Sequence, residues 1–365
     1  MSGVSAGYPG HHISTPYILP YLLEATNNCA KNFCEIEKGE NVLIASEYDT
    51  DPLVTSSFLS SAHLLGAEAT VITVRPFSVG GWVKNYPNDM FMAAFDKADV
   101  VIACTYFGFP HSERTFFSRI FAGRARVCDI SMGSTPGCLI TAGRFPDPLF
   151  VEIGKKAMRI LERAREIRYT TASGTDITFE GPRDMTYNKP LRSAKWGIFP
   201  PMGINFYPET SNGTLVFDES ALTGKPSSPI KLTVEKNFVI KVEGGSGAER
   251  DAIQSFANGK FFVRHTVIGL NPKVRMVNSP EFERERAAGT TYLGLDGSGP
   301  SGEIDRSKPG FSHLDMIFDT PTVYADGELL VKDRRLLILE DPDLMQFAEK
   351  YGDPKKVLAQ TPFLW

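Results

Sequence analysis

Residues 41–74 read NVLIASEYDTDPLVTSSFLSSAHLLGAEATVITV, and this stretch decides the fold class of the first half of the chain. The apolar run at 41–46 predicts a buried strand. The helical spacing of the apolar residues that follow predicts a helix ending at Gly66, and the run at 69–74 predicts a second strand. A strand, a helix and a strand in this order form one βαβ unit.

The same order of elements returns further along the chain. The run at 100–109 predicts a strand, residues 111–123 predict a helix and residues 125–131 predict another strand. Strands that alternate with helices predict a parallel sheet covered on both faces, here over residues 35–145. The amphipathic pattern of residues 148–168 predicts a long helix after this sheet.

The second half of the chain has a β-rich pattern. Its strand-like runs include IKLTVEKNFVIKVEGG, KFFVRHTVIGL and PTVYADGELLVKD, and the last of these predicts a hairpin that turns at Asp326-Gly327. We therefore predict an α/β protein with an N-terminal parallel-sheet, Rossmann-like domain at residues 1–168 and a C-terminal β-rich α+β domain at residues 169–365.

Composition excludes several classes of function. The 365 residues include 39 Lys and Arg against 43 Asp and Glu, and no basic run is long enough to follow a nucleic-acid backbone. No apolar stretch reaches the roughly 20 residues that cross a bilayer. The five cysteines are odd in number and form no CxxC motif, which is typical of reduced thiols. We expect a cytoplasmic protein that binds neither nucleic acid nor membrane.

Two segments of the sequence decide whether a nucleotide-binding site is predicted. Residues 297–302 match GxGxxG, but they lie between β segments and no helix follows them. The first βα turn reads SEYDTDP and contains no glycine that would let the backbone approach a pyrophosphate. No NAD site is therefore predicted.

Three residues of the second half form a candidate metal site. His313 and Asp315 lie two apart on a predicted strand and so share one face, while His265 belongs to the inward-facing alternating set Phe261, Val263, His265 and Val267. Spacing alone favours a hydrogen-bonded His–Asp pair and a satisfied core histidine over a metal site. Taken together, however, two histidines and one carboxylate are the ligand set of mononuclear Fe(II) enzymes, which leave coordination positions for substrate and O₂.

His111 is a candidate for acid–base chemistry. It follows the predicted buried strand at 100–109, at the carboxyl end where open α/β sheets bind ligands. A residue that merely begins the following helix is an equally good interpretation of this histidine.

Four segments of the second half resemble the 2,5-dihydroxypyridine 5,6-dioxygenase family of Fe(II) ring-cleaving enzymes, which is related to the metallo-aminopeptidases of the aminopeptidase T group. The segments are GTLVFDES at 213–220, LTVEKNFVIKVEGGSGAERD at 232–251, RHTVIGLNP at 264–272 and SHLDMIFDTPTVYADGELLV at 312–331. A weaker likeness covers residues 98–113. The resemblance implies that His265, His313 and Asp315 are the iron ligands and that His111 is one of two acid–base histidines.

The chain departs from both groups at particular positions. The peptidases hold two metals and have a Glu where this chain has His265, a further Glu near Ile204 or Asn205 and a His near Tyr292, so a dinuclear peptidase site is not expected. On the dioxygenase side, the second acid–base histidine falls on Ile198.

The loop before Ile198 is also altered. We therefore expect a related but differently substituted ring as substrate, with Tyr292, Glu180, Asp184 and Ile198 as weaker candidates for contacts to it.

The sequence as a whole predicts an Fe(II)-dependent dioxygenase that opens a hydroxylated aromatic or N-heterocyclic ring with O₂. The resemblance also implies a homo-oligomer. A metal-dependent hydrolase that uses the same three ligands is the main alternative. A binding or assembly protein, in which His313 and Asp315 only form hydrogen bonds, is a third.

Overall fold

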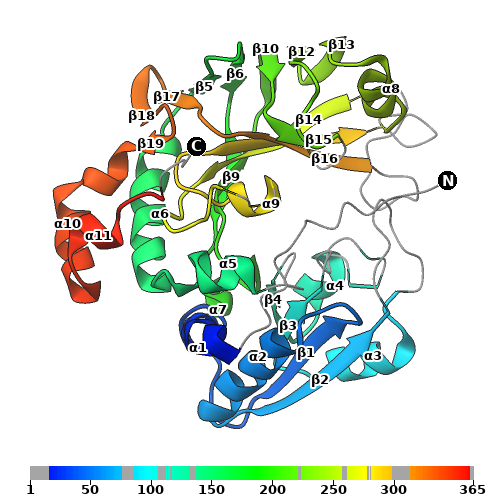
Figure 1. The fold of residues 1–365 in the computed structure, drawn as a ribbon, viewed down its shortest axis with the longest axis vertical. Coiled ribbons are helices and arrows are strands. Elements are labelled where there is room, and N and C mark those ends of the chain that lie inside the picture. Colours follow the sequence, from blue (N-terminus) through cyan, green and yellow to red (C-terminus); the bar gives the residue numbers. More distant parts are fainter. Residues whose placement is uncertain are drawn as a thin grey trace. The chain divides into compact units, whose positions relative to one another are not determined.

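A computed structural model gives the fold of the protein and groups its residues into two compact units (Figure 1). The first unit lies within residues 1–78, 83–147 and 189–200, and the second within 148–188 and 201–365. The structure describes residues 16–75, 86–105, 112, 114–115, 117–130, 136–220, 223–256, 261–277, 279, 281–297 and 312–361.

The first unit contains a five-stranded sheet in the order β2-β1-β3-β4-β8, and every pair of neighbours is parallel. The two predicted βαβ units are confirmed, because β1 and β2 each extend one residue beyond the predicted strand and β3 and β4 lie within the predicted ranges. The strands are β1 (Asn41–Glu47), β2 (Glu68–Val74), β3 (Val100–Cys104), β4 (Arg126–Asp129) and β8 (Trp196–Ile198).

Local sequence explains the first helix after β1. The Asp51 side chain accepts a hydrogen bond from the Leu53 amide at 2.9 Å, and Pro52 occupies the first helical position. Gly66, at a φ of +79°, follows the end of this helix, as predicted. The helices of the first unit are α1 (Leu19–Asn28), α2 (Pro52–Leu64), α3 (Asp89–Phe95), α4 (Phe117–Ala122), α5 (Gly137–Ile140) and α7 (Leu191–Ala194).

The second unit is built on a 14-stranded antiparallel sheet. Twelve strands follow one path, β11-β16-β15-β14-β13-β12-β10-β6-β5-β17-β18-β19, while β9 pairs with β14 and with β7. The strands are β5 (Glu166–Thr170), β6 (Asp176–Glu180), β7 (Arg183–Tyr187), β9 (Gly203–Tyr207), β10 (Thr210–Val216), β11 (Glu219–Ser220), β12 (Ile230–Glu235), β13 (Phe238–Gly244), β14 (Phe261–Gly269), β15 (Thr291–Gly297), β16 (Ser312–Phe318), β17 (Thr322–Ala325), β18 (Glu328–Lys332) and β19 (Arg335–Leu336).

The helix predicted at 148–168 is too long. The helix α6 spans Asp147–Leu161, and residues 166–168 belong to β5, which pairs with β6. Ile167 and Tyr169 are buried and Arg168 between them is exposed, so the local period is two rather than 3.6. The other helices of this unit are α8 (Gly247–Phe256), α9 (Glu281–Arg284), α10 (Pro342–Ala348) and α11 (Pro354–Val357).

The predicted hairpin at Asp326-Gly327 is confirmed. These residues have φ values of +47° and +82°, and they connect β17 to its antiparallel neighbour β18. Positive φ at both central residues is the geometry for which Asp-Gly hairpins are selected. In the described part of the chain, no helix is both long enough and apolar enough to span a bilayer.

Close contact between β9 and β14 depends on a glycine. A Cβ atom on Gly203 would lie 2.0 Å from the carbonyl oxygen of Ile268, and a backbone atom in a paired strand has little freedom to move. We expect Gly203→Ala to lower the free energy of unfolding by about 2 kcal/mol. Gly247→Ala, whose added Cβ meets no atom within 4 Å, is the matched control. Urea unfolding of both variants followed by circular dichroism measures the difference, and equal midpoints would refute the expectation.

Candidate metal centre

Three adjacent strands bring the predicted metal ligands to one place. His265 lies on β14 and His313 and Asp315 lie on β16, while β15 runs between these two strands and pairs with both (Figure 1). In the register, His265 is opposite Gly294, and Gly294 is opposite Asp315. Cross-strand partners project from the same face of a sheet, so His265 and Asp315 lie on one side of Gly294.

A bulge in β14 determines which face carries His265. Val263 pairs with Leu295, but His265 pairs with Gly294, so Arg264 is an extra residue in the ladder. Leu295 and Gly294 project from opposite faces of β15. The prediction that Val263 and His265 belong to one alternating set is therefore wrong, because strict alternation does not continue through a bulge.

The side chains of the triad converge. Nε2 of His313 lies 3.2 Å from Oδ1 of Asp315, and Nε2 of His265 lies 4.0 Å from the same oxygen. One ligand atom from each residue lies within 4.8 Å of the others. The two imidazole rings are stacked, with centroids 5.3 Å apart and planes inclined by 15°. Two histidines and one carboxylate in such an arrangement fit a single metal ion with coordination positions left for other ligands.

The side chains are shielded to different degrees. Those of His265 and His313 are 11% and 12% exposed, and that of Asp315 is 29% exposed. The imidazoles are thus nearly enclosed, whereas the carboxylate adjoins solvent. The Oδ1 atom of Asp315, which faces the two histidines, is itself buried.

Gly294 provides the space between the two rings. A Cβ atom there would lie 2.2 Å from Cε1 of His265 and 2.6 Å from Cε1 of His313. Any side chain on the central strand at this position would therefore have to displace both imidazoles. A glycine at this point of β15 is a steric condition for the triad.

Asp296 is a neighbour of the candidate site that sequence reasoning missed. Its carboxylate is fully buried, and its Oδ1 lies 2.7 Å from Nδ1 of His313. A protonated Nδ1 donates to Asp296, which leaves Nε2 as the ligand atom and fixes the orientation of the ring. The Arg264 guanidinium lies 3.7 Å from Oδ2 of Asp296. The sequence alone could not place Asp296 beside His313, because the contact depends on the pairing of β15 with β16.

The contact with Asp296 also bears on the predicted hydrogen-bonded pair of His313 and Asp315, because the two ring nitrogens of His313 face different carboxylates. The short contact of His313 Nδ1 is to Asp296, which leaves Nε2 directed to the side of Asp315.

Aromatic and aliphatic side chains line the same face. The ring of Tyr292 meets that of His265 edge-on, with centroids 5.8 Å apart. The centroid of the Tyr207 ring lies 6.0 Å from that of the His265 ring. Tyr292 packs with Val267 and Ile317 in a small buried cluster. Burial raises the pKa of Tyr292 well above its usual value, and the negative charge of Asp315 acts in the same direction. The Tyr292 phenol is therefore protonated at neutral pH.

The remaining predicted residues have different positions. Glu180 is an exposed residue of β6, which is separated from β14 by three strands in the sheet order. Asp184 is exposed on β7 and has a φ of +51°. Ile198 ends β8 in the first unit. His111 lies outside the described residues, as do 298–302 of the GxGxxG match.

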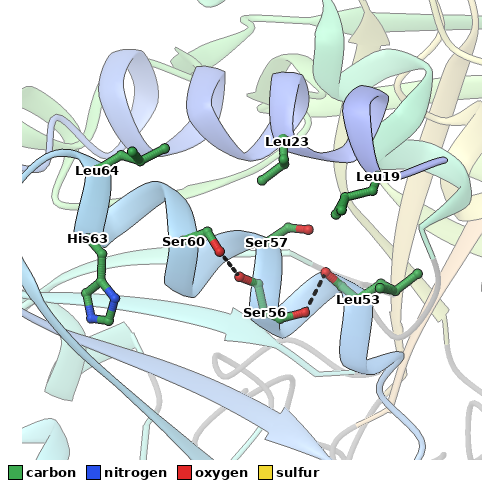
Figure 2. A pocket seen from close by; sticks show the side chains of 8 residues that line it. All are labelled: Leu19, Leu23, Leu53, Ser56, Ser57, Ser60, His63 and Leu64. Atoms are coloured by element: carbon green, nitrogen blue, oxygen red, sulfur yellow. Dashed lines mark hydrogen bonds between the residues drawn. The ribbon is translucent and has the colours of Figure 1, made fainter. Parts of the chain in front are cut away.

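The first unit has a groove that is separate from the predicted site residues. It runs between α1 and α2 and is lined by Leu19, Leu23, Leu53, Ser56, Ser57, Ser60, His63 and Leu64 (Figure 2). None of the predicted site residues lines this groove. Its apolar and hydroxyl lining offers no set of metal-ligating side chains.

A substitution that adds a side chain at Gly294 tests whether the triad needs the space at this position. We expect Gly294→Ala to weaken binding of a divalent transition metal by at least about tenfold, as do other changes to groups that orient metal ligands. Competition titration against a chromogenic chelator measures the affinity. Gly247→Ala, on α8, where an added Cβ meets no atom within 4 Å, controls for the loss of a glycine. Unchanged affinity in Gly294→Ala would contradict the steric role.

The contact between Asp296 and His313 gives a second test. Asp296→Asn keeps the size of the side chain but replaces the anionic acceptor, so we expect metal affinity to fall by about 10–100-fold. Asp176→Asn, at an exposed position on β6 of the same sheet, should leave the affinity unchanged. Both affinities can be measured by the same titration, and equal values in the two variants would remove Asp296 from the site.

Comparison with known proteins gives the family of the chain. The family profile NicX, 2,5-dihydroxypyridine 5,6-dioxygenase, matches residues 24–338. The 2,5-dihydroxypyridine dioxygenase structure from Pseudomonas putida KT2440 matches with a TM-score of 0.68 at 18% identity, over 89% of this chain and 99% of that one.

A second solved structure has the same fold. AmpT from Thermus thermophilus matches with a TM-score of 0.58 at 13% identity, over 87% of this chain and 100% of that one. Comparison with curated protein sequences gives no significant match. At these identities the structural matches concern the fold alone, whereas the family profile covers most of the chain. The chain belongs to the 2,5-dihydroxypyridine 5,6-dioxygenase family.

Proposed function

We propose that the protein is a mononuclear non-haem Fe(II) dioxygenase that opens a hydroxylated aromatic or N-heterocyclic ring, with His265, His313 and Asp315 as the iron ligands. The observation that carries the proposal is the convergence of these three side chains on one face of the sheet, with ligand atoms within 4.8 Å of one another. Family membership points to a dioxygenase and to a small N-heterocyclic substrate.

The donor set suits this metal. Fe(II) held by two imidazoles and one carboxylate keeps coordination positions at which a substrate oxygen and O₂ can bind together. Asp296 holds His313 in one tautomer through the 2.7 Å contact to Nδ1. His265 and His313 are nearly enclosed and Asp315 is partly exposed, so we propose that substrate approaches from the side of Asp315.

Tyr292 is the described residue best placed to orient a substrate. It is 5% exposed, adjoins His265 and carries a protonated phenol, so it can donate a hydrogen bond to an anionic substrate oxygen. His111 as acid–base residue, and Glu180, Asp184 and Ile198 as substrate contacts, are proposed from the resemblance of the sequence alone. A cytoplasmic homo-oligomer is likewise a prediction of the sequence.

A metal-dependent hydrolase is the second candidate, because AmpT shares the fold. Two observations favour the mononuclear enzyme. Tyr292 adjoins His265 where the peptidase relatives are expected to have a histidine, and Ile204 is fully buried on β9. Among the described residues, the groups of three or more potential metal ligands are this triad and a cysteine cluster in the first unit, with no second set of carboxylates beside the triad.

Metal content and oxygen uptake test the proposal. The protein is purified without oxygen, loaded with Fe(II) and offered dihydroxypyridines and hydroxylated aromatic acids. We expect one iron per chain and substrate-dependent oxygen consumption. His265→Ala should abolish both, whereas His63→Ala, which changes an exposed histidine of α2, should abolish neither.

Other outcomes would contradict the proposal in different ways. Bound metal with peptide or amide hydrolysis but no oxygen uptake would establish the hydrolase. Failure to bind any metal would leave His313 and Asp296 as a structural pair. Equal iron content in His265→Ala and in the unchanged protein would place the metal elsewhere.

A further inference from the structure

The first unit contains a second cluster of metal-ligating side chains. Sγ of Cys29 lies 3.7 Å from Sγ of Cys34 and 3.6 Å from Sγ of Cys128. The three sulfur atoms lie within 4.8 Å of one another, and all three residues are fully buried. No disulfide joins them. The cluster is independent of the triad, because its three members belong to the first unit.

An uncommon backbone feature brings two of these sulfurs together. The segment Cys29–Phe33 is a π-helical turn that follows α1, and the Cys34 amide donates to the Cys29 carbonyl at 2.7 Å. This wider turn places residues five apart in sequence next to each other, whereas an α-helix would place them on different faces. Single π-helical turns are rare and occur mainly at functional sites. Cys128 reaches the same point from the parallel strand β4.

The sulfur separations agree with a tetrahedral thiolate site. Zn–S bonds of about 2.3 Å at tetrahedral angles put neighbouring sulfurs about 3.8 Å apart. The observed separations of 3.6 and 3.7 Å are close to this value. A zinc ion could therefore bind with only small movements of the three side chains.

Asp147 is a candidate for the fourth ligand, although its carboxylate is not among the ligand atoms that lie within 4.8 Å of one another. It is 1% exposed, and in the described part of the chain neither carboxylate oxygen accepts a hydrogen bond. The Asp147 backbone amide donates to the side-chain oxygen of Asn28, the residue before Cys29, at 3.3 Å, so Asp147 lies close to the end of α1 that carries the cluster. A buried carboxylate without a hydrogen-bond donor is costly unless a cation or a proton satisfies it.

A positive charge lies beside the cluster. The Arg126 guanidinium donates to the Cys34 carbonyl at 3.2 Å. Thiolates rather than thiols are the metal-binding form of cysteine.

We propose that Cys29, Cys34 and Cys128, with Asp147 as fourth ligand, form a structural Zn²⁺ site in the first unit. Three thiolates select a thiophilic ion, and the oxygen ligand favours Zn²⁺ over Cu⁺. The complete burial of the three cysteines is typical of a closed, structural zinc site, which has no open coordination position.

Cobalt substitution of the full-length protein tests the proposal. Co²⁺ bound to thiolates shows a ligand-to-metal absorption in the near ultraviolet that the triad, which contains no sulfur, cannot produce. We expect this absorption at one equivalent of Co²⁺ per chain, and Zn²⁺ should abolish it. It should disappear in Cys128→Ser and persist in His265→Ala and in Cys138→Ser, which changes a half-buried cysteine outside the cluster.

A second variant covers the case in which Cys128→Ser does not fold. Asp147→Asn removes the anionic ligand and leaves the sulfurs in place, and we expect it to weaken Zn²⁺ binding by at least about tenfold in the His265→Ala background. Cobalt binding without thiolate absorption, absorption that persists in Cys128→Ser, equal zinc affinity in Asp147→Asn, or a disulfide between cluster cysteines would each overturn the proposal. In the first case the three cysteines are only apolar core residues.

Discussion

The candidate metal centre depends on a steric constraint in the middle strand of three. β15 must pair with β14 and β16 on either side and yet project nothing where His265 and His313 approach each other. Gly294 meets both requirements, since its backbone continues the ladder and its missing side chain leaves room for two stacked rings. The ligand set is thus defined as much by an absent side chain as by those that are present.

The bulge in β14 is the second condition for the same geometry. If the same residues of β14 paired with β15 without a bulge, Arg264 would lie opposite Gly294. His265 would then project with Val263 on the other face, and the two histidines would be on different sides of the sheet. A one-residue irregularity therefore converts two separate core positions into a ligand pair. Bulges next to active sites commonly redirect a side chain in this way.

Sequence periodicity predicted the parts of this protein whose structure is decided locally. The βαβ units and the Asp326-Gly327 hairpin follow from apolar patterning and turn chemistry, and the proximity of His313 and Asp315 follows from their spacing on one strand. The position of His265 relative to Gly294 and the contact of Asp296 with His313 depend on strand register, which is set by pairing between distant segments. The end of α6 was misplaced because residues 166–168 form a strand only through pairing with β6.

The order of the sheet has a consequence for how the protein matures. His265 and His313 come from opposite ends of a long stretch of chain, and they meet only when β14, β15 and β16 have all paired. Contacts between residues far apart in sequence form late, because closing a long loop costs entropy before the contact compensates for it. A partly synthesised or partly folded chain consequently presents isolated histidines with low affinity for metal. Acquisition of the metal at this site would then mark the completion of folding, and misfolded chains would be left without it.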